Sequence, residues 1–323
     1  MKAIVLAGGY ATRLWPITRH RPKMLLPVGD TTVIDRIFTE LEGDDRITDV
    51  FVSTNRRFAE HFRDHIASSR YEKLTLTVEE TTAETEKLGV VGALAQLVER
   101  EGIDEDTIVI AGDNLLSFDV SEFVDFFEEG GVPALAAYDV GSHDKASSYG
   151  VVELDGEQVV DFQEKPDEPA SSLVSIACYG FPAETIDLLS TYLEAGNNPD
   201  EPGWFVQWLL DRQPVRAFPF EEAWFDIGTP ESYLDALAWE FEGDARVAET
   251  ATVDGSTLGE NVHVMDGAEV VDAHLSESIV FPNATLRDCE VRSSIIDRDT
   301  AIDGLQLSGA QIGAHTQIVN GNE

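Results

Sequence analysis

A repeat of sixteen residues runs through the last part of the chain and leaves few folds open to it. Apolar residues recur at this interval in three sets, namely Val264, Val280, Ile296 and Ile312; Val270, Leu286, Ile302 and Ile318; and Leu275, Val291 and Leu307. Small residues follow the first set by four positions, at Ala268, Ala284, Thr300 and Thr316. The apolar positions within a unit are six residues apart, which is the period of a hexapeptide β-helix. We therefore predict a short parallel β-helix over residues 243–323, with coils of sixteen residues.

Strand and helix patterns alternate from Lys2 to about Glu242, which indicates an α/β sheet. We expect buried strands at residues 3–6 and 107–111. Further strands are expected at 50–53, 74–78, 132–140, 149–154, 158–163 and 174–181, and helices at 33–41, 61–66, 90–98, 183–193 and 204–210. The predicted architecture is a Rossmann-like mixed-sheet domain over residues 1–242, followed by the β-helix over 243–323.

The charge of the chain is strongly acidic. It has 22 basic and 61 acidic residues, a formal net charge of −39, and the acidic residues are dispersed along its length. Such a surface repels nucleic acids and anionic membranes, so neither is an expected partner. We interpret the charge as an adaptation to molar salt, where the Debye length is only about 3 Å and self-repulsion is screened.

Cysteine content and hydropathy indicate the cellular compartment in which the protein is found. The two cysteines, Cys178 and Cys289, each lie in an apolar stretch, which is typical of buried thiols in a reducing cytoplasm. The N-terminus leads directly into a strand without the pattern of a signal peptide, and no apolar run is long enough to span a membrane. We therefore expect a soluble, cytoplasmic protein.

The first predicted strand leads into a loop of small residues. Gly8, Gly9 and Tyr10 follow Leu6 closely and can expose backbone N–H groups to phosphate oxygens. Arg13 and Lys23 add two positive charges beside this loop. A glycine turn after a first strand is common for structural reasons alone, so this loop by itself indicates phosphate binding only weakly.

Three further charged residues occupy positions suited to phosphoryl chemistry. Asp113 follows a buried strand, where open α/β sheets bind ligands, and Asp226 has a similar setting. Two such carboxylates could share one Mg²⁺. Lys165 stands between Glu164 and a proline in a chain with only six lysines. Each residue also has a structural interpretation, because Asp113 could cap a turn and Asp226 could cap the helix that begins near Pro230.

The order of these motifs along the chain is that of a known family. The chain resembles the sugar-1-phosphate nucleotidylyltransferases, including the glucose-1-phosphate thymidylyl- and uridylyltransferases. The motifs that carry the resemblance are the signature from Gly8 to Pro27, Gly-Asp-Asn at 112–114, Tyr-Gly at 149–150, Glu-Lys-Pro at 164–166 and Trp-Phe-Asp-Ile-Gly-Thr at 224–229. The resemblance extends over essentially the full length and includes a C-terminal left-handed β-helix, which several members carry.

The resemblance implies a role for each matching residue. The nucleoside triphosphate would be bound by Leu6, Gly8, Gly9, Arg13, Gly89 and Asp113, with Gly89 against the nucleobase. Lys23 would neutralise the phosphates, and Arg13, Lys23 and Lys165 would be the catalytic group. Gly150, Glu164 and Lys165 would hold the sugar phosphate, and Asp113 and Asp226 would hold Mg²⁺. The sugar phosphate would attack the α-phosphorus in line and release pyrophosphate.

The identity of the substrates stays open at this point. UTP or dTTP with glucose-1-phosphate is the expected pair, and GTP with mannose-1-phosphate is the alternative, because the sequence from Leu88 to Ala93 also resembles the guanylyltransferases. Ala11 stands where many members have a third glycine. A non-catalytic paralogue and a solenoid that also transfers an acyl group are weaker alternatives. We further expect a homo-oligomer, with the β-helix packing on the catalytic domain or joining subunits.

The charge predicts a strong dependence of stability on salt. Raising KCl from 0.1 M to 2 M should raise the melting temperature by roughly 10 °C, equivalent to about 3 to 5 kcal/mol, because screening removes repulsion among the surface carboxylates. Thermal unfolding followed by circular dichroism would measure this shift. Sucrose of matched osmolality is the control, and an equal rise in sucrose would show that charge screening is not the cause.

Overall fold

The structure is a computed structural model that describes residues 1–79 and 88–319. Its contacts divide the chain into two compact units. Unit 1 comprises Met1–Gly9 and Ile34–Trp224, and unit 2 comprises Tyr10–Val33 and Phe225–Glu323. The loop that carries Arg13 and Lys23 therefore groups with the C-terminal strands, and the predicted division at residues 242 and 243 stays a prediction.

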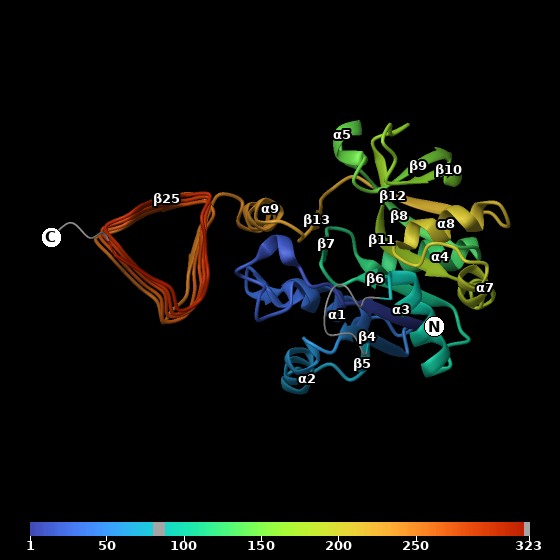
Figure 1. The fold of residues 1–323 in the computed structure, drawn as a ribbon, viewed down its shortest axis with the longest axis horizontal. Coiled ribbons are helices and arrows are strands. Elements are labelled where there is room, and N and C mark those ends of the chain that lie inside the picture. Colours follow the sequence, from blue (N-terminus) through green and yellow to red (C-terminus); the bar gives the residue numbers. More distant parts are fainter. Residues whose placement is uncertain (80–87, 320–323) are drawn as a thin grey trace. The chain divides into compact units, whose positions relative to one another are not determined.

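Unit 1 is built on a sheet of nine strands in the order β5-β4-β1-β6-β11-β8-β12-β10-β9 (Figure 1). The strands are β1 (Lys2–Leu6), β4 (Asp49–Asn55), β5 (Leu74–Glu79), β6 (Thr107–Ala111), β8 (Ala134–Asp139), β9 (Gly150–Asp155), β10 (Gln158–Glu164), β11 (Leu173–Phe181) and β12 (Arg216–Phe220). The first four strands of the sheet are mutually parallel, whereas β11 runs antiparallel to β6 and β8. The sheet is thus mixed, as predicted. A short strand β7 (Asn114–Leu116) pairs with β13 (Trp224–Asp226) outside it.

The helices of unit 1 form where an apolar face meets this sheet. They are α1 (Val33–Gly43), α2 (Ala59–Ser68), α3 (Val90–Glu101), α4 (Val120–Gly130), α5 (His143–Ala146), α6 (Ala183–Ile186), α7 (Leu188–Glu194) and α8 (Pro202–Leu210). In one core cluster, Ile4 and Val109 of adjacent strands pack with Leu94 of α3, Leu189 of α7 and Phe205 of α8. This packing holds the strands whose ends carry the predicted motifs.

Most predicted elements of unit 1 are confirmed, and the differences have local causes. The strand predicted at 107–111 has these bounds in the structure. The helix predicted at 183–193 is two helices, α6 and α7, which meet at Asp187. The sequence interpretation assigned no element to α4 or β12. Gly131 follows the last residue of α4 as its C-cap, and its φ of 60° suits a glycine.

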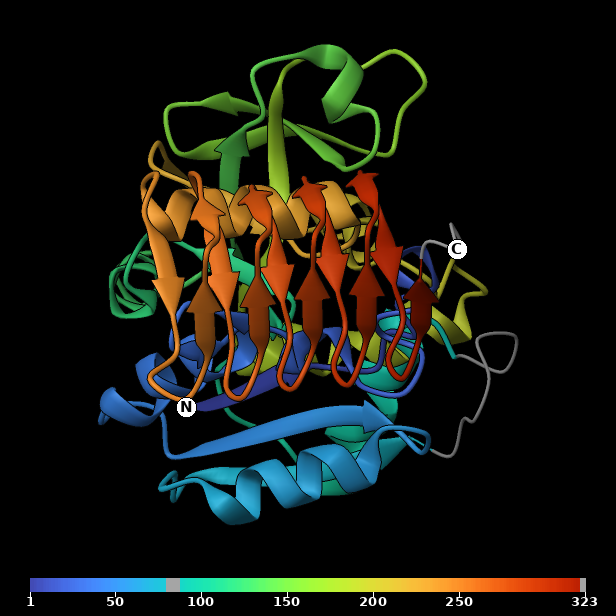
Figure 2. The ribbon, with the colours of Figure 1, turned by 90° about the vertical axis from the view of Figure 1, so that its left-hand side faces the viewer.

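The C-terminal part of unit 2 is a parallel β-helix, as predicted. Its strands are β14 (Ala245–Val247), β15 (Thr252–Asp254), β16 (Thr257–Leu258), β17 (Val262–Val264), β18 (Glu269–Val271), β19 (His274–Ser276), β20 (Ile279–Val280), β21 (Thr285–Arg287), β22 (Glu290–Arg292), β23 (Ile295–Ile296), β24 (Ala301–Asp303), β25 (Gln306–Ser308), β26 (Gln311–Ile312) and β27 (Gln317–Val319). They form three sheets, so that each coil is triangular in section and the coils stack along one axis (Figures 1 and 2). Val264 pairs with Val280 and Val280 with Ile296, so the repeat sets the register.

The rows of equivalent residues explain how each coil closes. Inward-facing residues such as Val270 and Leu286 are fully buried in the core of the helix. At the corners the backbone adopts positive φ at Asn261, Gly267, Asp272, Glu277, Asn283, Asp288, Ser293, Asp299, Gly304, Gly309 and His315. Asparagine, aspartate and glycine tolerate this conformation best, which accounts for most of these choices.

The remaining elements of unit 2 are short apart from one helix. They are the 3₁₀ helices η1 (Thr12–Leu14) and η2 (Lys23–Leu25), the strands β2 (Pro27–Val28) and β3 (Thr31–Thr32), and the helix α9 (Pro230–Phe241). The Tyr233 hydroxyl of α9 donates to the Pro27 carbonyl at 2.7 Å, which fixes the end of the loop on this helix. In the described part of the chain, no helix combines the length and apolar character needed to cross a bilayer.

The core of the β-helix should tolerate loss of volume far less than its end. Leu286→Ala should destabilise the protein by about 2 to 5 kcal/mol, because Leu286 is fully buried and would leave a cavity. Val253→Ala is the matched control, since Val253 occupies the same row in the first coil and is 36% exposed. It should cost less than about 1 kcal/mol. Equal losses in urea unfolding would contradict the assigned register.

Candidate active site

Leu6 and the glycines after it lie at the carboxyl end of β1 in unit 1. The Asn55 side chain donates to the Gly8 carbonyl at 2.7 Å, which holds the loop against β4. A Cβ atom on Gly8 would lie 3.1 Å from Oε1 of Glu79, so a side chain there would crowd this carboxyl group. Burial raises the pKa of Glu79. Gly9 is exposed, so its backbone is accessible to a ligand.

Asp113 follows β6 at the same edge of the sheet, because β1, β4, β5 and β6 run parallel. The Gly112 N–H donates to the Leu6 carbonyl at 2.8 Å and ties the two strand ends together. The indole N–H of Trp224 donates to Oδ1 of Asn114 at 3.2 Å. Asp113 therefore stands between two anchored neighbours, at the strand end where the sequence placed it.

The structure brings Gly150, Glu164 and Lys165 together in unit 1. Glu164 is paired with Gly150 in the register of β9 and β10, and a Cβ atom on Gly150 would lie 3.0 Å from Oε2 of Glu164. The Lys165 N–H donates to the Tyr149 carbonyl at 3.0 Å. The carboxyl group of Glu164 also lies against Gly203 of α8, where a Cβ atom would come within 1.6 Å of it.

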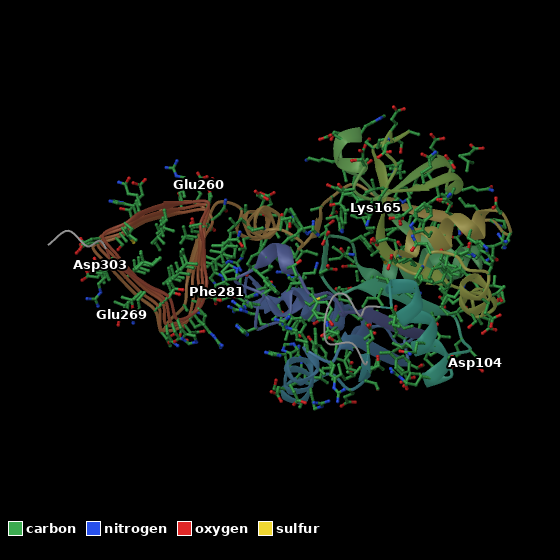
Figure 3. The ribbon with its side chains drawn as sticks, viewed as in Figure 1. Asp104, Lys165, Glu260, Glu269, Phe281 and Asp303 are labelled. Carbon is green, nitrogen blue, oxygen red and sulfur yellow. The ribbon has the colours of Figure 1, made fainter. Side chains whose placement is uncertain are left out.

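Two residues of this cluster were missed from the sequence. Gly203 has no side chain, and the Glu164 carboxyl group fills the space that one would occupy. Glu201 forms an ion pair with the ammonium group of Lys165 (Figure 3). Glu201 precedes Pro202 at the start of α8, a position that signals a helix start and gives no hint of a partner in β10. Burial, with a smaller contribution from Glu201, raises the pKa of Glu164 to about 7.

Unit 2 gathers the other predicted cations. Lys23 is only 8% exposed, and its ammonium nitrogen lies 3.7 Å from Oδ1 of Asp226. Arg13 is exposed on η1, and a Cβ atom on Gly228 would lie 2.9 Å from its Nη2 atom. The same Cβ atom would lie 3.3 Å from both carboxylate oxygens of Asp226. Gly228 thus allows a cation and an anion to approach one stretch of backbone.

The Asp226 carboxylate does not cap α9, which was the structural alternative for it. Thr229 is the N-cap residue, and its hydroxyl accepts from the Ser232 N–H at 3.1 Å. The Ser232 hydroxyl in turn accepts from the Thr229 N–H, which completes a capping box, and Pro230 takes the first helical position.

The backbone explains two positions that the sequence singled out. Ala11 has a φ of 48°, the left-handed conformation that glycine adopts without strain, which accounts for the glycine found there in many family members. The Thr18 hydroxyl donates to the Ala11 carbonyl at 2.7 Å and holds the turn. Gly89 has a φ of 79°, and a Cβ atom on it would lie 2.2 Å from the Pro199 carbonyl oxygen. Only glycine fits at residue 89.

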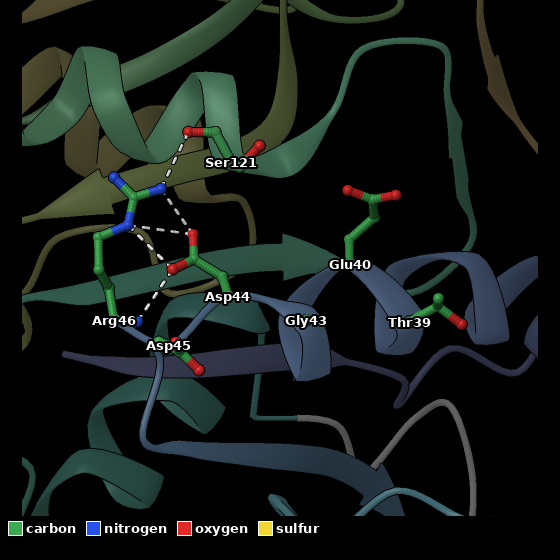
Figure 4. Close-up of a pocket in the computed structure, with 7 residues that line it drawn as sticks. All are labelled: Thr39, Glu40, Gly43, Asp44, Asp45, Arg46 and Ser121. Atoms are coloured by element: carbon green, nitrogen blue, oxygen red, sulfur yellow. Dashed lines mark hydrogen bonds and ion pairs between the residues drawn. The ribbon is translucent and has the colours of Figure 1, made fainter.

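A pocket of about 430 Å³ elsewhere in unit 1 contains none of these residues (Figure 4). It is lined by Thr39, Glu40, Gly43, Asp44, Asp45, Arg46 and Ser121. The guanidinium group of Arg46 is already bonded to Asp44, Asp125, Glu128 and the Ser121 carbonyl. Because its cation is neutralised and its other charges are negative, the pocket does not suit a phosphate.

The histidines of the β-helix lie on different parts of it. His263 packs on Phe241 with ring centres 5.3 Å apart, and burial lowers its pKa. His274 lies in β19, and His315 lies at a corner. Within residues 1–79 and 88–319, no three histidine, cysteine or acidic side chains form a metal-binding group.

Comparison with known proteins agrees with this fold. Residues 2–241 match the family model described as nucleotidyl transferase, and the chain belongs to this family of sugar-1-phosphate nucleotidyltransferases. It is 28% identical to a Sulfolobus acidocaldarius protein named "Putative mannose-1-phosphate guanyltransferase", over 84% of this chain and 74% of that protein. It is also 27% identical to the low-salt glycan biosynthesis nucleotidyltransferase Agl11 of Haloferax volcanii, over 97% of this chain and 94% of that protein.

Two further comparisons concern thymidylyltransferases. The glucose-1-phosphate thymidylyltransferase of Streptomyces antibioticus is 28% identical over 98% of this chain and 93% of that protein. A crystal structure of a "Putative Glucose-1-Phosphate Thymidylyltransferase" from Bacillus anthracis, in complex with a sucrose, matches with a TM-score of 0.65 and 27% identity. That match covers 74% of this chain and 95% of the other.

The buried carboxyl group of Glu164 predicts a dependence of stability on pH. Its pKa is higher in the folded protein than the ordinary 4.5, so its contribution is favourable below pH 4.5 and is lost as the pH rises through about 7. Glu164→Gln removes the charge, and its melting temperature relative to the wild type should be higher at pH 8 than at pH 5.5. After allowance for solvent, the difference corresponds to about 1 to 2 kcal/mol. Glu153→Gln, on neighbouring β9, is the control, and an equal pH effect there would contradict the assignment.

Proposed function

We propose that the protein transfers a nucleotidyl group from UTP or dTTP to glucose-1-phosphate and releases pyrophosphate. The observation that carries this proposal is the nearly buried Lys23, whose ammonium group lies 3.7 Å from the Asp226 carboxylate, with Arg13 beside the same backbone at Gly228. A buried cation that faces a carboxylate suits a site that receives a polyphosphate and a divalent metal ion.

The proposed roles follow the chemistry of each group. Gly8 and Gly9 offer backbone N–H groups to the triphosphate. Arg13 offers the N–H groups of its exposed guanidinium group to the same phosphates. Lys23 neutralises charge that develops on the phosphates during transfer. An oxygen of the sugar phosphate forms a bond to the α-phosphorus while the bond to the pyrophosphate oxygen breaks. Positioning and charge neutralisation account for the catalysis, because this reaction needs no covalent intermediate on the protein.

The second substrate is assigned to the cluster around Glu164. Lys165 would exchange the Glu201 carboxylate for the phosphate of the sugar phosphate, a stronger acceptor with more charge. Glu164 accepts hydrogen bonds from sugar hydroxyl groups when it is ionised. Gly150 leaves room for the sugar to approach the backbone, which a side chain would block.

Asp113 and Asp226 are the proposed ligands of Mg²⁺. Carboxylate oxygens are hard donors, and Mg²⁺ is commonly held by one or two carboxylates together with phosphates and water. When bound, the ion would polarise the phosphate oxygens and offset their charge.

A second substrate pair is favoured by specific observations. The motif from Leu88 to Ala93 resembles that of the guanylyltransferases, and the Sulfolobus relative is named for that activity. GTP with mannose-1-phosphate is therefore the second candidate. We also propose a homo-oligomer, for which light scattering in molar KCl is the direct measurement.

A panel of substrates tests the proposal. We expect pyrophosphate release in 2 M KCl with Mg²⁺ to be at least about tenfold faster with UTP or dTTP and glucose-1-phosphate than with any other pair, because a mismatched base or sugar leaves buried polar groups unpaired. EDTA should abolish the reaction. Lys165→Met is the control and should raise KM for the sugar phosphate far more than KM for the triphosphate. Preference for GTP and mannose-1-phosphate would select the second candidate. The absence of turnover with every pair would refute the proposal that the protein catalyses this transfer.

A further inference from the structure

One face of the β-helix differs from the other two. On the sheet that contains β20 and β23, the outward-facing residues Ile279, Phe281 and Ile295 are buried. Outward residues on the neighbouring sheet, such as Glu269 and Arg287, are exposed, and Figure 3 shows Phe281 and Glu269 on different sides of the triangle. The first face is therefore covered within unit 2, and we refer to it as the covered face.

The N-terminal loop supplies part of that cover. The guanidinium carbon of Arg21 lies 4.6 Å from the centre of the Phe281 ring, a cation–π contact. At the next coils the loop also meets Gly313, where a Cβ atom would lie only 2.9 Å from Cβ of Pro16. The β-helix thus contacts the loop that carries Arg13 and Lys23, through residues of one unit.

A single buried charge lies in this contact. The row of equivalent positions on the covered face reads Met265, Phe281, Asp297 and Gly313, at intervals of sixteen residues, and only Asp297 is charged. Asp297 is 2% exposed, and its carboxylate forms an ion pair with Nη2 of Arg21. A buried carboxylate is costly unless it is paired. The Arg298 N–H donates to the same Oδ1 atom at 2.7 Å, and Arg21 supplies the counterion.

Arg21 is connected to Lys23 by a short and stiff path. Its Nε–H also donates to the Ile17 carbonyl at 3.0 Å, so two nitrogens of the guanidinium group are held. Pro22 separates it from Lys23 and has a φ of −69°, which the ring restricts. The Leu26 N–H donates to the Lys23 carbonyl at 2.9 Å, so the backbone on the other side of Lys23 is held as well. We therefore expect a shift of Arg21 to displace Lys23.

We propose that Asp297 of the β-helix is a positioning residue for Lys23 and acts through Arg21. The inference rests on the proposed function, because Lys23 must meet the triphosphate for its position to matter. It gives the β-helix a part in the transfer reaction besides packing or assembly. A misplacement of about 1 Å in a catalytic group can lower the rate by as much as a hundredfold, so a tenfold effect is expected when the pair is lost.

Three variants separate positioning from stability. Asp297→Asn and Arg21→Met each leave one member of the ion pair without its counterion, so both should lower the melting temperature and lower kcat about tenfold. In the double variant neither charge remains, so the melting temperature should recover most of the loss. The kcat of the double variant should stay low, with KM for the sugar phosphate within twofold of the wild type. Recovery of kcat together with the melting temperature would show a merely structural pair and overturn the proposal.

Two comparisons complete the test. Glu290→Gln makes the same carboxylate-to-amide change at an exposed position one strand earlier in the repeat and should leave kcat unchanged. In a Lys23→Ala background, Asp297→Asn should change the residual rate by less than twofold, since the residue through which it acts is gone. A further tenfold loss there would overturn the proposal. An active wild type with an unaffected Asp297→Asn variant refutes the positioning role alone, whereas an inactive wild type refutes the proposed function and this role with it.

Discussion

The contact between the N-terminal loop and the covered face of the β-helix is the constraint on which the cation cluster of unit 2 depends. Residues 10–32 contain only short 3₁₀ helices and two-residue strands, so few hydrogen bonds within the segment define its conformation. Tyr233 anchors the loop to α9, and the Arg21–Asp297 ion pair anchors it to the β-helix. A loop that binds phosphate needs such external support, because a flexible cation loses entropy and precision when it binds.

The parts of the fold that the sequence predicted are those with a strong periodicity. The sixteen-residue rows identified the β-helix, since Val264, Val280 and Ile296 face one core and pair in register. Apolar runs identified the central strands in the same way. The helix break at Asp187 escaped prediction because α6 and α7 together carry one continuous apolar pattern, and the turn between them leaves no glycine or proline as a signal.

The residues of the candidate site likewise fall into those that a local sequence motif reveals and those that it does not. Gly150, Glu164 and Lys165 are close in sequence or paired in neighbouring strands, so a motif captures them. Glu201 and Gly203 come from a helix start about forty residues later, and nothing in their local sequence points to a carboxyl group in β10. Asp297 is a still longer-range case, because its partner is 276 residues away in the chain. Its only signal was a charge in a row of uncharged residues.

The cluster around Glu164 shows why a site can accept an unfavourable charge. Its carboxyl group is pressed against Gly150 and Gly203 with a raised pKa, and Lys165, the one cation beside it, is shared with Glu201. Two carboxyl groups around one ammonium group are poorly balanced in the free protein. Under the assignment proposed above, a phosphate bound at Lys165 would displace Glu201, and sugar hydroxyl groups would donate to the ionised form of Glu164. The raised pKa of Glu164 therefore marks a carboxyl group whose charge state depends on what lies beside Lys165.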